Sequence, residues 1–350
     1  MPQVVDIVFL GCFTLTVSAV LTPLVIRLCH KHSALDEPGG RKIHAHGVPR
    51  LGGVSIFIAI SLGMALAGLS VMLGWLTIDD KQIRLLPAVY IGLCGYFAIG
   101  FVDDLRSLPA LPRLAGQLVT AYAVVLVSGG AISVGSLFGH LVLPGWLAAI
   151  MTVAWIAGVV NTFNWIDGLD GLSAGLGGIS ALAFLALVLL KPGQPNAVLT
   201  AMLCVLLLGA IIGFLFYNFH PAKIFIGDGG AFSLGYLLAI ISILSLFKQA
   251  AIIAFILPIL ILALPISDTA FAILRRLIRG QPITKPDDKH IHHRTLAFMS
   301  RNYRAALSDE KRAQLQEQLA VNPAHRNAVL ALYIFAAVFA GAAVVVGANL

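Results

Sequence analysis

Charge is scarce in this sequence: only 11% of its 350 residues are Asp, Glu, Lys or Arg, whereas 59% are hydrophobic. The mean hydropathy is +0.94, and apolar runs of about 20 residues recur along the chain, which excludes a soluble globular protein. No Lys or Arg precedes Arg27, and no small-residue cleavage site follows the first run. We therefore expect that run to be a retained span and not a signal peptide. The composition predicts one all-α, polytopic membrane domain over residues 1–350.

Cysteine is also rare, and its spacing carries no chemistry. Cys12, Cys29, Cys94 and Cys204 lie in or beside apolar runs, without a CxxC pair or any other spacing typical of ligands. This pattern supports neither a disulfide framework nor a cysteine metal centre. We interpret the four residues as small side chains buried in the membrane.

About ten apolar windows are long enough to cross a bilayer. They lie near residues 6–28, 51–73, 85–102, 114–132, 144–160, 173–190, 197–216, 230–247, 250–273 and 327–348. When the linkers are placed alternately on two sides, 19 of the 23 Lys and Arg fall on one side and four on the other. The positive-inside rule makes the first side cytoplasmic and puts both termini outside. The net charge of +7 is thus explained by topology, and we expect no nucleic acid partner.

Polar residues gather in the cytoplasmic linkers, which indicates that any chemistry faces the cytoplasm. The first linker, "DEPGGRKIHAHGVPRLGG", contains Arg41, Lys42 and His44. We take these three as candidate substrate-binding residues, with an ordinary basic loop as the alternative.

The third span ends in "GFVDDLRSL", with Asp103 and Asp104 adjacent directly after the apolar run. Neighbouring carboxylates at a membrane edge repel each other and lose solvation, so they need a cation, a partner or a proton. A solvated helix end is the alternative.

"NTFNWIDGLDGL", residues 161–172, adds Asn164, Asp167 and Asp170 between the fifth and sixth spans. Its glycines let the backbone approach a ligand closely. A plain polar turn would not require this much acid.

"YNFHPAKIFIGDGGAFSLG" supplies Asn218 and places Asp228 among glycines at the start of a helix. Free N–H groups at a helix N-terminus suit a phosphate, and a lone carboxylate among them suits a hard cation bridging to it. Asp228 is therefore the first candidate for a metal ligand, with Asp104 as a second.

The last cytoplasmic loop, residues 274–326, contains "DDKHIHHRTL" with His290, His292, His293 and Arg294. Clustered imidazoles without cysteine are typical of a transition-metal site, but beside Arg and Lys they serve equally well as an anion clamp. Because all five groups lie on one face, we expect a single site that transfers a phosphoryl group between a soluble diphosphate and a lipid, with Mg²⁺.

In matching order, "DEPGGRKIHAHGVPRLGG", "FVDD", "NTFNWIDGLDGL", "FIGDGGAFSLG", "PISDT" and "HIHHR" resemble the motifs of the polyprenyl-phosphate N-acetylhexosamine-1-phosphate transferases. That family includes the bacterial enzymes that start O-antigen, enterobacterial common antigen and teichoic acid assembly, and the translocase that makes lipid I. The resemblance covers residues from about 36 to 294. Arg113 stands where many members have lysine, which preserves the charge.

The resemblance implies a multi-pass enzyme of the bacterial plasma membrane that moves sugar 1-phosphate from a UDP-N-acetylhexosamine to undecaprenyl phosphate and releases UMP. It implies Mg²⁺, with Mn²⁺ as an alternative, and a possible homodimer. Asp228 resembles the metal ligand, and Asp103 with Asp104 the group that deprotonates or positions the lipid phosphate. The remaining matches are the nucleotide-side positions Asp167 and Asp170, the pocket residue Asn218, the uracil-stacking Phe225, and the loop that contacts the donor's sugar and phosphate, His290, His292, His293 and Arg294.

Several alternatives stay open at this stage. The form "HIHHR" favours UDP-GlcNAc over UDP-MurNAc-pentapeptide as donor, while UDP-GalNAc or a deoxy amino sugar fits as well. A one-step in-line displacement is preferred to a route through a phosphorylated Asp103. A secondary transporter should carry its charges near the bilayer midplane, not at helix ends. A CDP-alcohol phosphotransferase should show "DGxxAR", which is not found here. A scaffold without activity would hardly retain every acid.

Overall fold

The structure is a computed structural model that describes residues 2–36, 47–133, 143–245, 259–278, 290–305 and 323–349. In these ranges nine helices are long and apolar enough to cross a membrane. They are α1 (Pro2–Lys31), α2 (Gly53–Met72), α4 (Leu86–Arg106), α5 (Ala110–Val127), α6 (Gly145–Ile166), α7 (Leu172–Leu190), α8 (Ala197–Asn218), α9 (Gly227–Leu244) and α14 (Pro323–Ala348). The all-α, multi-pass prediction is confirmed.

Shorter elements complete the described chain. α3 (Asp80–Ile83), α11 (Ala263–Ile278) and α12 (Ile291–Ala305) are helical, and β1 (Leu35–Asp36) pairs antiparallel with β2 (Val48–Pro49). The predicted span 250–273 lies partly outside the described residues, and its second half belongs to α11. The predicted ligands Arg41, Lys42 and His44 also lie outside them.

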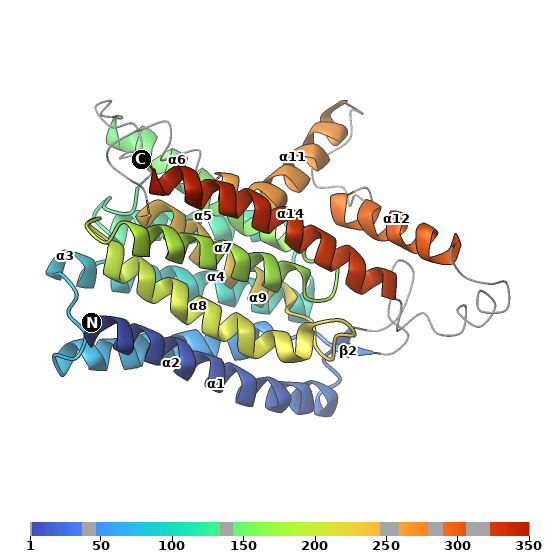
Figure 1. Cartoon of the computed structure of the whole chain (residues 1–350), viewed down its shortest axis with the longest axis horizontal. Helices are drawn as coiled ribbons and strands as arrows, with labels where there is room; N and C mark the ends of the chain where they lie inside the picture. The colour runs from blue at the N-terminus through green and yellow to red at the C-terminus, as the bar shows by residue number, and fades with distance from the viewer. Residues whose placement is uncertain are drawn as a thin grey trace.

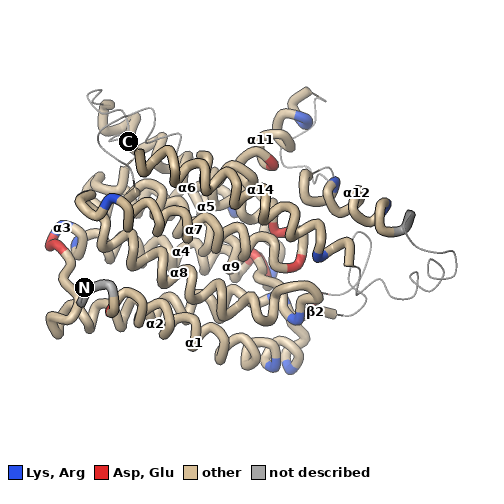
Figure 2. The backbone as a smooth tube through the Cα atoms, in the orientation of Figure 1, with Lys and Arg blue, Asp and Glu red and all other residues tan. Residues whose placement is uncertain are grey.

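The long helices lie side by side along the long axis of the molecule, with α9 inside the bundle (Figure 1). Both chain termini lie at one end, and the β hairpin and α12 lie at the other (Figure 1). Figure 2 shows that charged residues gather toward the two ends and leave the middle of the bundle without charge. This distribution suits a bundle whose middle lies in hydrocarbon.

Helix α9 forms the centre because it is apolar on every side. All its residues from Gly229 to Leu244 are buried, against α2, α4, α6, α7 and α8. A helix without a polar face is stable only where other helices surround it. The outer helices instead expose large apolar side chains such as Phe9 (58%) and Ile334 (66%), as expected of a surface in contact with lipid.

Two glycines bring the outer helices onto the start of α9. A Cβ on Gly53 of α2 would lie 2.6 Å from Gly230 Cα, and one on Gly100 of α4 would lie 2.6 Å from Gly229 Cα. Both distances are too short for any other residue to fit unless a helix moves. The start of α9 therefore lies directly against the end of α4.

The helices extend past the predicted apolar runs at the end of the bundle that holds the β hairpin. α4 continues from the predicted limit, 102, to Arg106, and α6 continues from 160 to Ile166. The polar residues after each run keep the helical conformation, so Asp103 and Asp104 lie in a last helical turn and not in a loop. Ser107, with φ 48°, ends α4.

Backbone hydrogen bonds join the segment before α2 to the loop before α9. The Phe225 N–H donates to Pro49 O at 2.8 Å, the Gly52 N–H to Phe225 O at 3.0 Å, and the Gly53 N–H to Ile226 O at 2.7 Å. The end of the first cytoplasmic linker and the segment before Asp228, which are far apart in the sequence, are thus joined by backbone hydrogen bonds beside the end of α4.

Candidate active site

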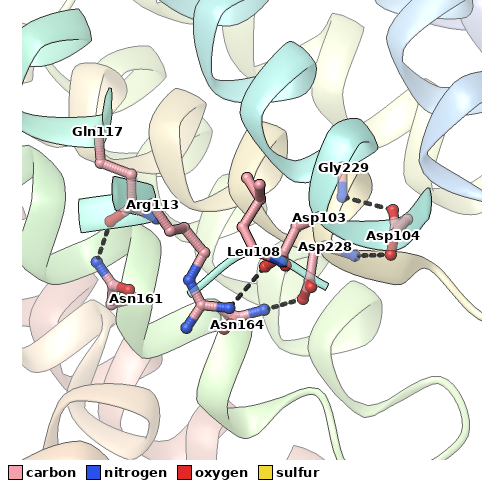
Figure 3. A network of polar contacts seen from close by, with 9 residues as sticks. All are labelled: Asp103, Asp104, Leu108, Arg113, Gln117, Asn161, Asn164, Asp228 and Gly229. Atoms are coloured by element: carbon pink, nitrogen blue, oxygen red, sulfur yellow. Dashed lines mark hydrogen bonds and ion pairs between the residues drawn. The ribbon is translucent and has the colours of Figure 1, made fainter. Parts of the chain in front are cut away.

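Asp104 binds the start of α9 (Figure 3). Its Oδ1 accepts the Asp228 N–H at 2.8 Å and its Oδ2 accepts the Gly229 N–H at 3.0 Å. A carboxylate from another helix thus satisfies two N–H groups at the positive end of the α9 dipole. Gly227 is required here, because its φ is +69° and a Cβ would lie 2.7 Å from Asp104 Oδ2. The prediction that these N–H groups are free for a phosphate is wrong for Asp228 and Gly229.

Asp103 is buried and paired. Its Oδ2 lies 2.6 Å from Arg113 Nη1, and its Oδ1 accepts the Leu108 N–H at 2.6 Å. Arg113 comes from the first turn of α5 and keeps 24% of its side chain exposed. The pair therefore presents a guanidinium at the edge of the site.

Asp228 and Asp167 have fewer partners. The Asn164 amide donates a hydrogen bond to Asp228 Oδ1 (Figure 3). Asp167 follows the end of α6, and its carboxylate accepts no hydrogen bond in the part of the chain that the structure describes. Burial, and then the charges of Asp228 and Asp104, raise the pKa of Asp167 well above its usual value. We call Asp103, Asp104, Asp167 and Asp228 the acidic cluster.

Asn161 and Gln117 extend this cluster between α5 and α6. The Asn161 amide donates to Gln117 Oε1 at 2.7 Å (Figure 3), and the Tyr96 hydroxyl donates to Gln117 O at 2.9 Å. Gln117 was not predicted, since a lone glutamine in an apolar run gives no signal of its partner. The network fixes the helices that carry Arg113 and Asn164.

Asp170 joins three segments. Its Oδ2 lies 2.6 Å from His220 Nδ1 and accepts the Ala222 N–H at 3.2 Å, while its own N–H donates to His325 Nε2 at 3.0 Å. Burial alone would raise the pKa of Asp170, but the His220 hydrogen bond and the nearby His325 lower it below its usual value. The predicted nucleotide-side residue thus holds the loop between α6 and α7 in place.

The histidine motif begins a helix and does not lie in an irregular loop. Asp268 of α11 lies beneath it: His292 Nδ1 and His290 Nδ1 are 3.0 and 3.2 Å from Asp268 Oδ2. The His293 ring tilts against His292 at 4.3 Å, and Arg294 is exposed. The two distances to Asp268 are typical of hydrogen bonds or ion pairs. The ligand atoms of Asp268, His290 and His292 are also close enough together to surround a metal.

The histidine motif contacts the loop that carries Asp167, and the contact is at Gly168. A Cβ on Gly168 would lie 3.0 Å from His292 Cδ2 and closer still to Nε2. His292 therefore packs on the backbone next to Asp167. Of the five predicted groups, the structure brings four together at one end of the bundle: the paired aspartates, the Asp167 loop, the Asp228 motif and the histidine motif.

Arg276 is a second unpredicted residue of this region. It is 6% exposed, its guanidinium lies 5.1 Å from the Trp165 ring, and Nε and Nη1 have no hydrogen-bond partner among the described residues. An unpaired cation in a buried place is costly unless an anion joins it. Arg276 is therefore a candidate for binding an anionic substrate group.

Asn218 and Phe225 shape the loop before α9. Asn218 is buried and its amide donates to Ile224 O at 2.8 Å, so in this structure it supports the loop backbone. Phe225 is partly exposed, with both backbone polar groups bonded to the segment before α2.

Comparison with known proteins gives consistent matches. Residues 86–246, which contain the whole acidic cluster, match the model of glycosyl transferase family 4. A probable undecaprenyl-phosphate N-acetylglucosaminyl 1-phosphate transferase of Bacillus subtilis is 36% identical over 347 residues, 98% of this chain and 86% of that protein. A decaprenyl-phosphate N-acetylglucosaminephosphotransferase of Mycolicibacterium smegmatis is 31% identical over 322 residues, 86% and 78% of the two chains. A phospho-N-acetylmuramoyl-pentapeptide-transferase of Shouchella clausii is 32% identical over 272 residues, 71% and 77%.

Proposed function

The chain belongs to glycosyl transferase family 4, and on this premise we propose that it transfers N-acetylglucosamine 1-phosphate from UDP-GlcNAc to undecaprenyl phosphate and releases UMP. The names of the Bacillus and Mycolicibacterium relatives support the sugar phosphate and the polyprenyl phosphate acceptor. The N-acetylglucosamine form is preferred to the muramoyl-pentapeptide form because the Bacillus similarity is higher and covers more of the chain.

The observation that carries the proposal is the unequal pairing of the acidic cluster. Asp103 and Asp104 are held by Arg113 and by backbone N–H groups, whereas Asp228 and Asp167 have no cationic partner in the described ranges. Two partly buried carboxylates without a cation repel each other, and this repulsion favours a bound divalent ion.

This donor set fits Mg²⁺, which prefers carboxylate oxygens and keeps room for substrate phosphates. Asp228 would hold the ion, with Asp167 as the second carboxylate. Asp104 is better suited to fixing the start of α9, because both its oxygens already accept backbone N–H groups. When bound, the ion would neutralise charge on the diphosphate during transfer.

Cationic side chains near the cluster suit the two anionic substrates. Arg113 stands at the edge of the cluster, where the lipid phosphate would approach, and Arg276 lies buried beside Trp165 near the histidine motif. Bringing two phosphates together requires positive charge to offset their repulsion. We assign Arg113 to the acceptor phosphate and Arg276 to the donor.

The reaction that this arrangement supports is a single displacement. An oxygen of the lipid phosphate attacks the β-phosphorus of UDP-GlcNAc, the bond from that phosphorus to the bridging oxygen breaks, and UMP leaves. Such transfer depends on positioning and charge neutralisation. Both carboxylate oxygens of Asp103 are already engaged, Oδ2 by the Arg113 guanidinium and Oδ1 by the Leu108 N–H. We therefore prefer a positioning role for Asp103, and rapid-quench trapping of a phosphorylated enzyme would overturn this choice.

We further propose that the acidic cluster faces the bacterial cytoplasm and that both termini lie outside. Most Lys and Arg fall in the linkers of the cluster's side, and both termini lie at the opposite end of the bundle (Figure 1). By the positive-inside rule, the end with most Lys and Arg faces the cytoplasm, and the opposite end, with both termini, therefore lies outside.

The test incubates the purified protein with undecaprenyl phosphate, Mg²⁺ and each of three donors: UDP-GlcNAc, UDP-GalNAc and UDP-MurNAc-pentapeptide. UMP release is measured. We expect turnover with UDP-GlcNAc and a loss of at least about a hundredfold in Asp228→Asn. Asp79→Asn is the matched control, because Asp79 is an exposed cap of α3 far from the cluster. No turnover with any donor would refute the function, and full activity in Asp228→Asn would refute the metal assignment.

A further inference from the structure

Asp268 is a buried carboxylate to which neither the sequence motifs nor the proposed reaction gives a role. It is 1% exposed, on the stripe of α11 that faces the protein, where every fourth residue is buried: Leu264, Asp268, Ala272 and Arg276. A carboxylate in such a place is retained only with partners. Its partners therefore indicate what it does.

Within the described ranges, the hydrogen bonds and ion-pair contacts of Asp268 go to the start of α12. Oδ1 accepts the Ile291 N–H at 2.6 Å, and Oδ2 accepts a hydrogen bond from His292 Nδ1 at 3.0 Å. His290 Nδ1 lies 3.2 Å from the same oxygen. One side chain of α11 thereby fixes both the first turn of α12 and the His292 ring.

The hydrogen bond decides which nitrogen of His292 is available. A carboxylate accepts and cannot donate, so the proton of neutral His292 stays on Nδ1 and its lone pair is on Nε2. The Nε2 edge points away from Asp268 toward Gly168, because a Cβ on Gly168 would collide with it. The available nitrogen thus faces the turn that carries Asp167.

We propose that Asp268 is a positioning residue for the transfer reaction, which holds His292 so that Nε2 is directed at the donor beside Asp167. This inference rests on the proposed function for its substrate. Loss of a carboxylate that orients a metal-ligating histidine typically costs about ten- to hundredfold in activity, and we expect a loss of the same size for His292. Asp268→Asn keeps the shape but replaces one oxygen with a donor, which favours the opposite His292 tautomer.

A purely structural link between α11 and α12 would also be weakened by this substitution, so the test must separate the two roles. His292→Asn does so, because its amide nitrogen occupies the place of Nδ1 and can still donate to Asp268, while Nε2 is lost. If Asp268 acts through His292 Nε2, Asp268→Asn should lower kcat in the unaltered protein and have no further effect in His292→Asn, which has no Nε2.

The experiment measures kcat for the unaltered protein, Asp268→Asn, His292→Asn and the double variant, with UDP-GlcNAc, undecaprenyl phosphate and Mg²⁺. We expect Asp268→Asn to lower kcat about ten- to hundredfold in the unaltered background and to leave the His292→Asn kcat unchanged. Ser267→Ala is the control on the same helix, since it removes only a hydrogen bond to Leu264 O, and it should retain activity. Equal losses in both backgrounds would overturn the proposal.

A second readout needs no turnover. In protein labelled with ¹⁵N-histidine, the His292 signals, assigned by their absence in His292→Asn, should show Nδ1 protonated at neutral pH and a change toward Nε2 in Asp268→Asn. An Nε2-protonated, neutral ring in the unaltered protein would overturn the proposal. If the unaltered protein shows the expected tautomer but releases no UMP, the proposed function is wrong. A failure of the proposed function can therefore be distinguished from a failure of the inference on Asp268.

Discussion

Gly100→Ala is expected to separate the two halves of the acidic cluster without touching a carboxylate. Gly100 lies on α4 one turn before Asp103, and its Cα faces the start of α9. A Cβ at this position would lie 2.5 Å from Asp228 C and 2.6 Å from Gly229 Cα, both backbone atoms that no rotamer change can move. One helix must therefore shift.

The size of the shift follows from these distances. An ordinary contact begins at 3.4 Å and the Cβ would lie 2.5 Å from Asp228 C, so α9 must move about 0.9 Å away from α4. Because Asp104 is on α4 too, its hydrogen bonds to the Asp228 and Gly229 N–H groups, 2.8 and 3.0 Å long, would lengthen beyond the limit of about 3.2 Å. Overpacking of this kind costs about 1–3 kcal/mol of stability. A misplacement near 1 Å at the reacting groups lowers kcat about a hundredfold.

The assay is UMP release at saturating UDP-GlcNAc, with thermal denaturation of the same samples in detergent. Gly95→Ala is the matched control: it lies on the same helix, but its Cβ would meet the Thr120 side chain of α5, with Cγ2 at 2.6 Å, and not the backbone of α9. We expect Gly95→Ala to retain kcat and Gly100→Ala to lose it with little change in KM. Unaltered kcat in folded Gly100→Ala would refute the claim that the α4–α9 contact sets the geometry of the cluster.

Three further predictions concern the loop between α6 and α7. Asp167→Asn should raise the melting temperature in EDTA, because the pKa of Asp167 is raised and its charge is destabilising at neutral pH; this advantage should vanish with Mg²⁺, and a lower melting temperature in EDTA would contradict the argument. Tyr333→Phe should lower the free energy of unfolding by about 1 kcal/mol, since the hydroxyl donates to Gly171 O; an unchanged denaturation midpoint would exclude this contribution. Asp170 has a lowered pKa, so it stabilises the fold above its unfolded pKa of about 3.9 and loses this effect as pH falls further. The melting temperatures of the unaltered protein and Asp170→Asn should therefore converge only below about pH 4, and convergence already at pH 6 would argue against the paired carboxylate.

The elements of this fold were predictable because hydropathy decides them locally. Each of the nine described spans coincides with a predicted apolar run to within a few residues. The start of α9 near Asp228 was predictable as well, since an Asp directly before an apolar run is typical of the first turn of a helix. The acids also gather at one end of the bundle, as expected from their places at the ends of the runs.

The partners of those acids were not predictable from spacing. Asp104 and the Asp228 N–H are 124 residues apart, and Asp170 is 155 residues from His325. Hydrophobic periodicity shows which face of a helix is buried but not which residue of another helix meets it. Free N–H groups at α9 were expected for that reason, and Asp104 occupies them. Asp268 stands in the quoted motif "PISDT", but the motif alone gave it no role, and Arg276 was missed because it stands in a basic run.

The pairing of the aspartates also explains why so many acids coexist at one end of an apolar bundle. Asp104, Asp170 and Asp268 each accept a backbone N–H from a distant segment, so they act as connectors between helices and loops. A connector needs no bound ion, because its partners already supply the positive charge or the N–H dipole. Asp228 and Asp167 lack such partners among the described residues, yet the connectors hold them near each other. Charge repulsion between two carboxylates that cannot move apart is relieved only by a proton or a cation, so the connectors would favour the divalent ion that we propose for this site.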